Sequence, residues 1–283
     1  MNHPAKSGGS SSDEALQRAR IALRNQRPDE AERFARDFLQ GNPSHKQAVN
    51  ILGYALLMQQ RADDAIAVLE PAARTLRDAE IDTQLALALR QAGRDEDAVA
   101  RFKRATKRQP PFPPAFYELG ILLHAMKRSE EAIEVLTAGL AAGPMPELSD
   151  QIGHIFLSMK DYASAKSAFA KTLAITLAMA PHAASALWGM GKACQGLGEH
   201  KSAIDYFRRC LAQAPNDAGT LLNLGHCLLE TGELNEGYKC FRAAARGDEN
   251  RYAAALATLV KSSQGRFWLR PSAARKFLRD ESV

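Results

Sequence analysis

Apolar residues recur along most of the chain at three- and four-residue steps, which is the spacing of one face of an α-helix. Short polar turns separate these stretches, and glycine stands in several of them, as at Gly93, Gly198 and Gly232. Proline, which cannot continue a helix, follows the stretches at Pro43, Pro110, Pro144 and Pro215. The pattern predicts an all-α chain of consecutive short helices.

Pairs of small residues repeat along these predicted helices, the second member twelve positions after the first. The second members lie 34, 33, 34, 33, 38 and 34 residues apart, a period that indicates stacked structural repeats. The pairs are Ala19 with Ala31, Gly53 with Ala65, Ala86 with Ala98, Gly120 with Ala132, Gly153 with Ala165, Gly191 with Ala203, and Gly225 with Gly237.

Larger apolar residues accompany each pair and are expected to fill the space around it. Four positions after the second small residue stand Leu69, Phe102, Leu136, Phe169, Phe207 and Phe241. Small residues allow two antiparallel helices to approach closely, while the larger ones occupy the gap to the next pair. Each period is therefore predicted to be a helix-turn-helix unit.

One period carries the marks of a known family most completely. Its residues are Phe116-Tyr117-Glu118-Leu119-Gly120, Ala132, Leu136 and Pro144. They resemble the W-x-x-L-G-x-x-Y, A-x-x-x-F and closing proline of the tetratricopeptide repeat, and the resemblance covers roughly residues 12 to 251. It implies a right-handed α-solenoid of about seven repeats with a C-terminal capping helix. We expect a flexible tail at 1–12, repeats at 13–251, and the capping helix with an aromatic-basic segment at 252–283.

One departure from the period makes a specific prediction. The fifth repeat closes at Pro181, four residues late, so its second helix, near 163–180, is expected to be about one turn longer than the others. A further helical stretch near 252–263 is expected to cap the last repeat.

Stacked helix pairs wind into a superhelix whose inner wall is formed by the first helix of each repeat. In the proteins that this chain resembles, the wall positions lie a few residues before and just after the conserved glycine. Carried over by position, the candidate groove residues are Asn50, Tyr54, Leu87, Arg90, Tyr117, Ile121, His124, Asp150, His154, Trp188, Lys192, Asn223 and His226.

Aromatic, imidazole and amide side chains in such a wall suit recognition of a peptide, whose backbone needs hydrogen bonds and whose side chains need apolar contacts. The sequence therefore predicts a non-catalytic scaffold or adaptor that binds a peptide or helical segment of another protein. The alternatives are an RNA-binding helical repeat and a self-assembling scaffold in which one copy captures the tail of another. Nucleic acid is the less expected partner, because residues 261–283 carry +4 of the net charge of +5 and leave the repeats near neutral.

No catalytic or metal motif is evident. The chain lacks phosphate-binding glycine loops and the H-E-x-x-H pattern, and its four cysteines include no C-x-x-C pair and occupy positions expected to pack in the core. Asp150 and His154, four apart on one helix, are expected to make a surface contact. The sequence therefore predicts no enzyme, no metal and no cofactor.

The C-terminal segment breaks the repeat pattern and is both aromatic and basic. Its candidate residues are Phe267, Trp268, Arg270 and Phe277. They are expected to cover the last repeat as a lid, to form an exposed docking motif, or to bind anionic lipid or nucleic acid. A cytoplasmic location is expected, since no apolar stretch is long enough to cross a membrane and the first residues lack a secretory signal.

Overall fold

The computed structural model describes residues 8–176, 181–246, 249–261 and 271–279, and these residues form helices and connecting turns with no strand. The helices are α1 Gly8–Arg24, α2 Pro28–Gly41, α3 Lys46–Met58, α4 Ala62–Leu76, α5 Ala79–Gln91, α6 Asp95–Ala105, α7 Pro113–Ala125, α8 Ser129–Ala142, α9 Pro146–Ser158, α10 Tyr162–Ile175, α11 Pro181–Gly196, α12 His200–Gln213, α13 Ala218–Glu230, α14 Leu234–Ala245, α15 Glu249–Lys261 and α16 Pro271–Arg279.

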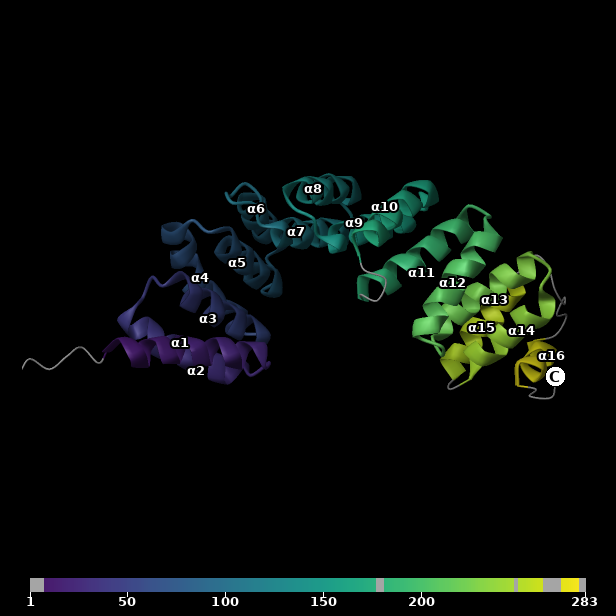
Figure 1. The fold of residues 1–283 in the computed structure, drawn as a ribbon, viewed down its shortest axis with the longest axis horizontal. Coiled ribbons are helices and arrows are strands. Elements are labelled where there is room, and N and C mark those ends of the chain that lie inside the picture. Colours follow the sequence, from purple (N-terminus) through teal and green to yellow (C-terminus); the bar gives the residue numbers. More distant parts are fainter. Residues whose placement is uncertain (1–7, 177–180, 247–248, 262–270, 280–283) are drawn as a thin grey trace, which may run out of the picture. The chain divides into compact units, whose positions relative to one another are not determined.

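The chain forms two compact units, Met1–Gly143 with α1–α8 and Pro144–Val283 with α9–α16. Within each unit, consecutive helices pack in pairs, such as α1 with α2 and α9 with α10 (Figure 1). The first helix of a pair also contacts the first helix of the next pair, as α3 contacts α5 and α11 contacts α13. Each unit is thus a stack of helix hairpins, as the repeat pattern predicts. The count of about seven repeats stays a prediction.

The small-residue pairs lie where paired helices come closest. A Cβ atom added to Gly120 would lie 2.5 Å from the Leu136 side chain, and one added to Gly191 would lie 2.5 Å from the Phe207 ring. Leu136 and Phe207 are fully buried, and burying a side chain of this size stabilises a fold by about 1.5–3 kcal/mol. At these positions the large residue therefore packs against the small residue of its own helix pair.

In the turn inside each helix pair, one residue adopts the left-handed backbone conformation, with a positive φ angle. In one turn this residue is a glycine, Gly93, with φ of 75°. In two other turns it is Gln60 or Lys127, with φ of 60° and 66°. The Arg61 amide donates to the Leu56 carbonyl and ends α3 in the manner of a Schellman motif. The turn is therefore retained even where the sequence does not supply glycine.

Two expected boundaries differ in the structure. The prediction of a longer second helix at 163–180 is wrong, because α10 ends at Ile175 with 14 residues, the same length as α8 and α12. Thr176 adopts an extended backbone there, which suits two successive β-branched residues. At the N-terminus, α1 begins at Gly8, inside the segment 1–12 that was expected to be a tail.

Within the part of the chain that the structure describes, no helix is both long enough and apolar enough to cross a membrane. All four cysteines are buried and free of disulfide bonds. The expected cytoplasmic location stays a prediction.

Candidate functional site

The predicted groove residues share one structural position. They lie on the first helices of the pairs, and all are half-buried except Asn50, which is buried with 7% of its surface exposed. By helix, they are Asn50 and Tyr54 on α3; Leu87 and Arg90 on α5; Tyr117, Ile121 and His124 on α7; Asp150 and His154 on α9; Trp188 and Lys192 on α11; Asn223 and His226 on α13.

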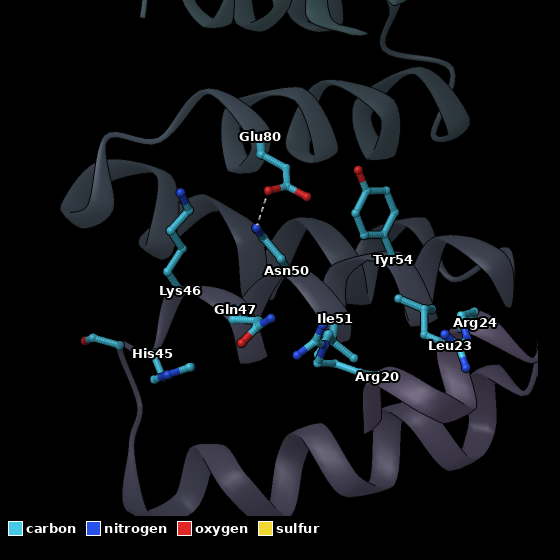
Figure 2. Close-up of a pocket in the computed structure, with 11 residues that line it drawn as sticks. Arg20, Leu23, Arg24, His45, Lys46, Gln47, Asn50, Ile51, Tyr54 and Glu80 are labelled. Atoms are coloured by element: carbon cyan, nitrogen blue, oxygen red, sulfur yellow. Dashed lines mark hydrogen bonds between the residues drawn. The ribbon is translucent and has the colours of Figure 1, made fainter. Parts of the chain in front are cut away.

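In the first unit, a pocket of about 810 Å³ opens between α1, α3 and the start of α5. We call it the α1/α3/α5 pocket. Figure 2 shows Tyr54 and Asn50 extending from α3 toward α5, with the α1 side chains on the other side of α3. Its lining residues are Arg20, Leu23, Arg24, Ser44, His45, Lys46, Gln47, Asn50, Ile51, Tyr54 and Glu80.

The pocket includes α1 residues that the prediction omitted. Arg20 and Leu23 lie one and four positions after Ala19, which is the spacing of Leu87 and Arg90 after Ala86. The signal was therefore present in the repeat register.

Glu80 organises the polar side of the pocket. Asn50 Nδ2 donates to Glu80 Oε2 at 2.8 Å (Figure 2). Lys46 Nζ lies 2.5 Å from Asp78 Oδ2. Burial raises the pKa of Glu80, and Asp78 adds to this effect while Lys46 opposes it. Burial also raises the pKa of the Tyr54 phenol, so this group stays protonated and able to donate a hydrogen bond at neutral pH.

Arg20 and Arg24 give the pocket a basic side. Both are exposed, and neither forms an ion pair with another of the described residues. Leu23 lies between them in sequence and is half-buried on the same lining. The pocket thus offers an apolar surface next to cationic groups that an incoming anion can bind.

A second hollow, of about 440 Å³, lies next to the first and shares Tyr54 with it. Its lining residues are Tyr54, Leu57, Met58, Leu87, Arg90 and Gln91. Arg90 Nη1 lies 3.5 Å from Glu118 Oε2 on α7, and burial raises the pKa of Glu118 although Arg90 opposes the shift. The four predicted residues of α3 and α5 therefore all line one of these two hollows.

The predicted residues of α7 line neither hollow. Tyr117, Ile121 and His124 are half-buried on the same helix, and His124 Nδ1 lies 3.1 Å from Oγ of Ser129, the first residue of α8. The structure therefore places them on the first helix but does not bring them into the α1/α3/α5 pocket.

In the second unit, two predicted residues, Asp150 and His154, meet at a serine that the prediction did not include. Ser185 Oγ donates to Asp150 Oδ2 at 2.8 Å and lies 3.0 Å from His154 Nε2. The His154 ring stacks on Trp188, with the ring centroids 6.2 Å apart. The same His154 nitrogen lies 3.5 Å from Asp150, which agrees with the expected contact.

This serine, histidine and aspartate do not form a catalytic relay. In such a relay the histidine takes the serine proton on one ring nitrogen while the aspartate holds the other nitrogen. Here the Ser185 hydroxyl donates a hydrogen bond to Asp150, and both side chains lie beside the same nitrogen, Nε2 of His154. The arrangement joins α9 to α11 through side-chain hydrogen bonds.

The remaining predicted residues of this unit join α11 to α13. Lys192 Nζ donates to Asn223 Oδ1 at 3.1 Å and to Gln195 Oε1 at 2.8 Å, and Gln195 Nε2 lies 3.3 Å from His226 Nδ1. Burial lowers the pKa of Lys192. These residues contact one another across neighbouring repeats.

Of the candidate C-terminal residues, Phe277 is described, whereas Phe267, Trp268 and Arg270 lie outside the described residues. The Phe277 ring meets Tyr238 edge-on at 5.0 Å and lies 4.4 Å from the Arg242 guanidinium. Arg242 Nε also donates to the Phe277 carbonyl at 3.2 Å. α16 thus packs against α14 through Phe277, and the lid and docking interpretations of the segment stay predictions.

Solved structures of low sequence identity share the fold. A chain of the APC/C hetero-tetramer Cut9–Hcn1 is 14% identical over 87% of this chain, with a TM-score of 0.60, and the match spans 49% of that chain. The type IV pilus biogenesis factor PilW is 20% identical over 78% of this chain and all of its own length, with a TM-score of 0.61. YrrB, described as a TPR protein with an unusual peptide-binding site, is 17% identical over 66% of this chain and 96% of its own, with a TM-score of 0.56.

Comparison with curated protein sequences gives no match. Three family models described as tetratricopeptide repeat match residues 16–79 and 83–144, residues 146–216, and residues 196–259. These matches cover most of the helix hairpins in both units. The chain therefore belongs to the tetratricopeptide repeat family.

Proposed function

We propose that this chain is a non-catalytic scaffold that binds a peptide or helical segment of a partner protein against the first helices of the first unit. The family and the fold support a role in protein–protein interaction. The observation that carries the finer proposal is the α1/α3/α5 pocket, which has the concave form and the mixed apolar and polar lining typical of binding sites.

The chemistry of the pocket supports one kind of partner segment. Leu23 and the Tyr54 ring provide apolar contact, while Arg20 and Arg24 provide two cations on the same side. Glu80 is engaged by Asn50 and does not neutralise these arginines. A segment with an apolar anchor and a neighbouring acidic residue would satisfy both features.

The second hollow extends the surface along the stack. Tyr54 separates the two hollows and is positioned to contact a ligand lying in either one. A bound segment that passes Tyr54 would reach Leu87 and Arg90 on α5, so it would contact three successive first helices. Contact with several repeats is the usual way in which stacked repeats form an extended binding surface.

Site-specific photo-crosslinking in native cell extract tests this proposal. A photoreactive phenylalanine analogue replaces Leu23 in the pocket or, as control, Ile21, which is on the same helix and exposed but does not line the pocket. We expect Leu23 to crosslink one defined partner segment that Ile21 does not capture, and Tyr54→Ala to reduce the crosslink. Equal capture from both positions would contradict the proposal.

A further inference from the structure

Two imidazoles and a thiol converge where the start of α12 meets α13. His200 is the first residue of α12, and His226 and Cys227 are neighbours on α13. One ligand atom from each of the three lies within 4.8 Å of the others. The two rings are tilted by 47°, with their centroids 6.2 Å apart. We propose that His200, His226 and Cys227 form a binding site for Zn²⁺.

The burial of the cluster supports this site. Cys227 is completely buried, and the Nδ1 atom of His200 is buried with no hydrogen-bond partner among the residues that the structure describes. Buried polar atoms in folded proteins nearly always have a partner, so each exception calls for a physical reason. Coordination of a cation by this nitrogen would satisfy it.

His226 is held on both sides of its ring. Its Nδ1 lies 3.3 Å from Gln195 Nε2, and its Nε2 lies 3.9 Å from Glu230 Oε1. Whichever nitrogen binds the metal, the other keeps a polar neighbour that orients the ring, which is the usual outer-shell arrangement at histidine ligands.

Lys192 is a cation close to His226. The Lys192 ammonium is held by Gln195 and Asn223, so its own donors are directed to those side chains.

The donor set selects the metal. Two nitrogens and one sulfur form a borderline-soft set that suits Zn²⁺ in tetrahedral geometry. Bond lengths of about 2.0–2.1 Å to nitrogen and 2.3 Å to sulfur place tetrahedral donors roughly 3.3–3.8 Å apart, so donors that lie within 4.8 Å of one another must approach by at most about 1.5 Å. Rotation of the half-buried His200 side chain contributes to this approach.

Binding includes one proton transfer. Cys227 is a buried free thiol before the metal arrives. On binding, the S–H bond breaks, the proton leaves to solvent, and a bond forms between sulfur and Zn²⁺ without any change in oxidation state. Uptake of Zn²⁺ should therefore release protons.

The test titrates Zn²⁺ and Co²⁺ into the full chain. We expect a single equivalent of Zn²⁺ to bind, and Co²⁺ to give a thiolate-to-cobalt charge-transfer band. Cys227→Ser should abolish that band, and His200→Gln should weaken binding by more than about 100-fold. Cys240→Ser is the matched control, because Cys240 is a buried free thiol of the same unit outside the cluster.

Circular dichroism establishes that each variant is folded, and His200→Gln decides the test if Cys227→Ser does not fold. His200 is only half-buried at a helix start, so its substitution should be tolerated. A wild-type chain that gives no cobalt band, or a band that persists unchanged in His200→Gln, would overturn the site.

Discussion

Asn50 Nδ2 donates a hydrogen bond to Glu80 Oε2 at 2.8 Å, joining α3 to α5 at the wall of the α1/α3/α5 pocket. Asn50 was predicted as a ligand-binding residue, but it is buried and its amide is engaged within the protein. Its position indicates that it holds Glu80 and the adjoining pocket wall in place.

Replacing Asn50 should therefore cost stability. Asn50→Ala leaves a half-buried carboxylate without its donor, and we expect the free energy of unfolding to fall by about 1–3 kcal/mol. Gln47→Ala, three residues earlier in the same helix and exposed, should change it by less than about 0.5 kcal/mol. Urea unfolding followed by circular dichroism measures both, and equal effects would contradict the structural role of Asn50.

Close helix approach makes a second prediction. In Gly191→Ala the new methyl group would lie 2.5 Å from the Phe207 ring, so we expect a loss of about 1–3 kcal/mol. Gly219→Ala is the control, because its nearest neighbour is an Asp217 oxygen at 3.6 Å, and it should leave stability unchanged or raise it by up to about 1 kcal/mol. Thermal unfolding of the two variants compares them, and similar melting temperatures would contradict the packing described for Gly191.

The raised pKa of Glu118 predicts a specific pH dependence. Because burial raises this pKa above its unfolded value, the contribution of Glu118 to stability is fully present below about pH 4.3 and is lost as the pH rises through the folded pKa. Glu118→Gln does not titrate, so its stability relative to the wild type should increase between pH 4 and pH 7.

Glu131 is the matched control, because its pKa is shifted in the opposite direction to that of Glu118. The hydrogen bond from Arg128 lowers the pKa of Glu131, so its contribution is present above the unfolded pKa and is lost as the pH falls. Glu131→Gln should therefore lose stability relative to the wild type as the pH rises. Urea unfolding at several pH values measures both slopes, and slopes of the same sign would contradict the assignment.

Much of the fold follows from the sequence because repeat packing is encoded locally. The spacing from Gly120 to Ala132 and Leu136 fixes which residues meet between paired helices, and the same relation recurs in other repeats. The end of α10 at Ile175 was not predicted, because the position of the next proline limits a helix without requiring it to extend that far.

The site was predictable only in part. Repeat register placed Tyr54, Leu87 and Arg90 on the surface that forms the hollows. The position of a residue within its repeat does not specify which side chain it contacts. That contact depends on the side-chain rotamers and on the residues of the neighbouring repeat. The contacts of Asn50 with Glu80 and of His154 with Ser185 therefore appear only in the three-dimensional structure.

The most direct test of the central claim is the affinity of peptides selected from a random display library by the intact chain. We expect the selected peptides to combine an apolar and an acidic residue, and to lose more than about tenfold in affinity for Tyr54→Ala and Arg24→Glu. Arg74→Glu, a charge reversal at an exposed position on α4, should bind them as the wild type does. Selected peptides that bind all three variants equally well would contradict a binding site between α1, α3 and α5.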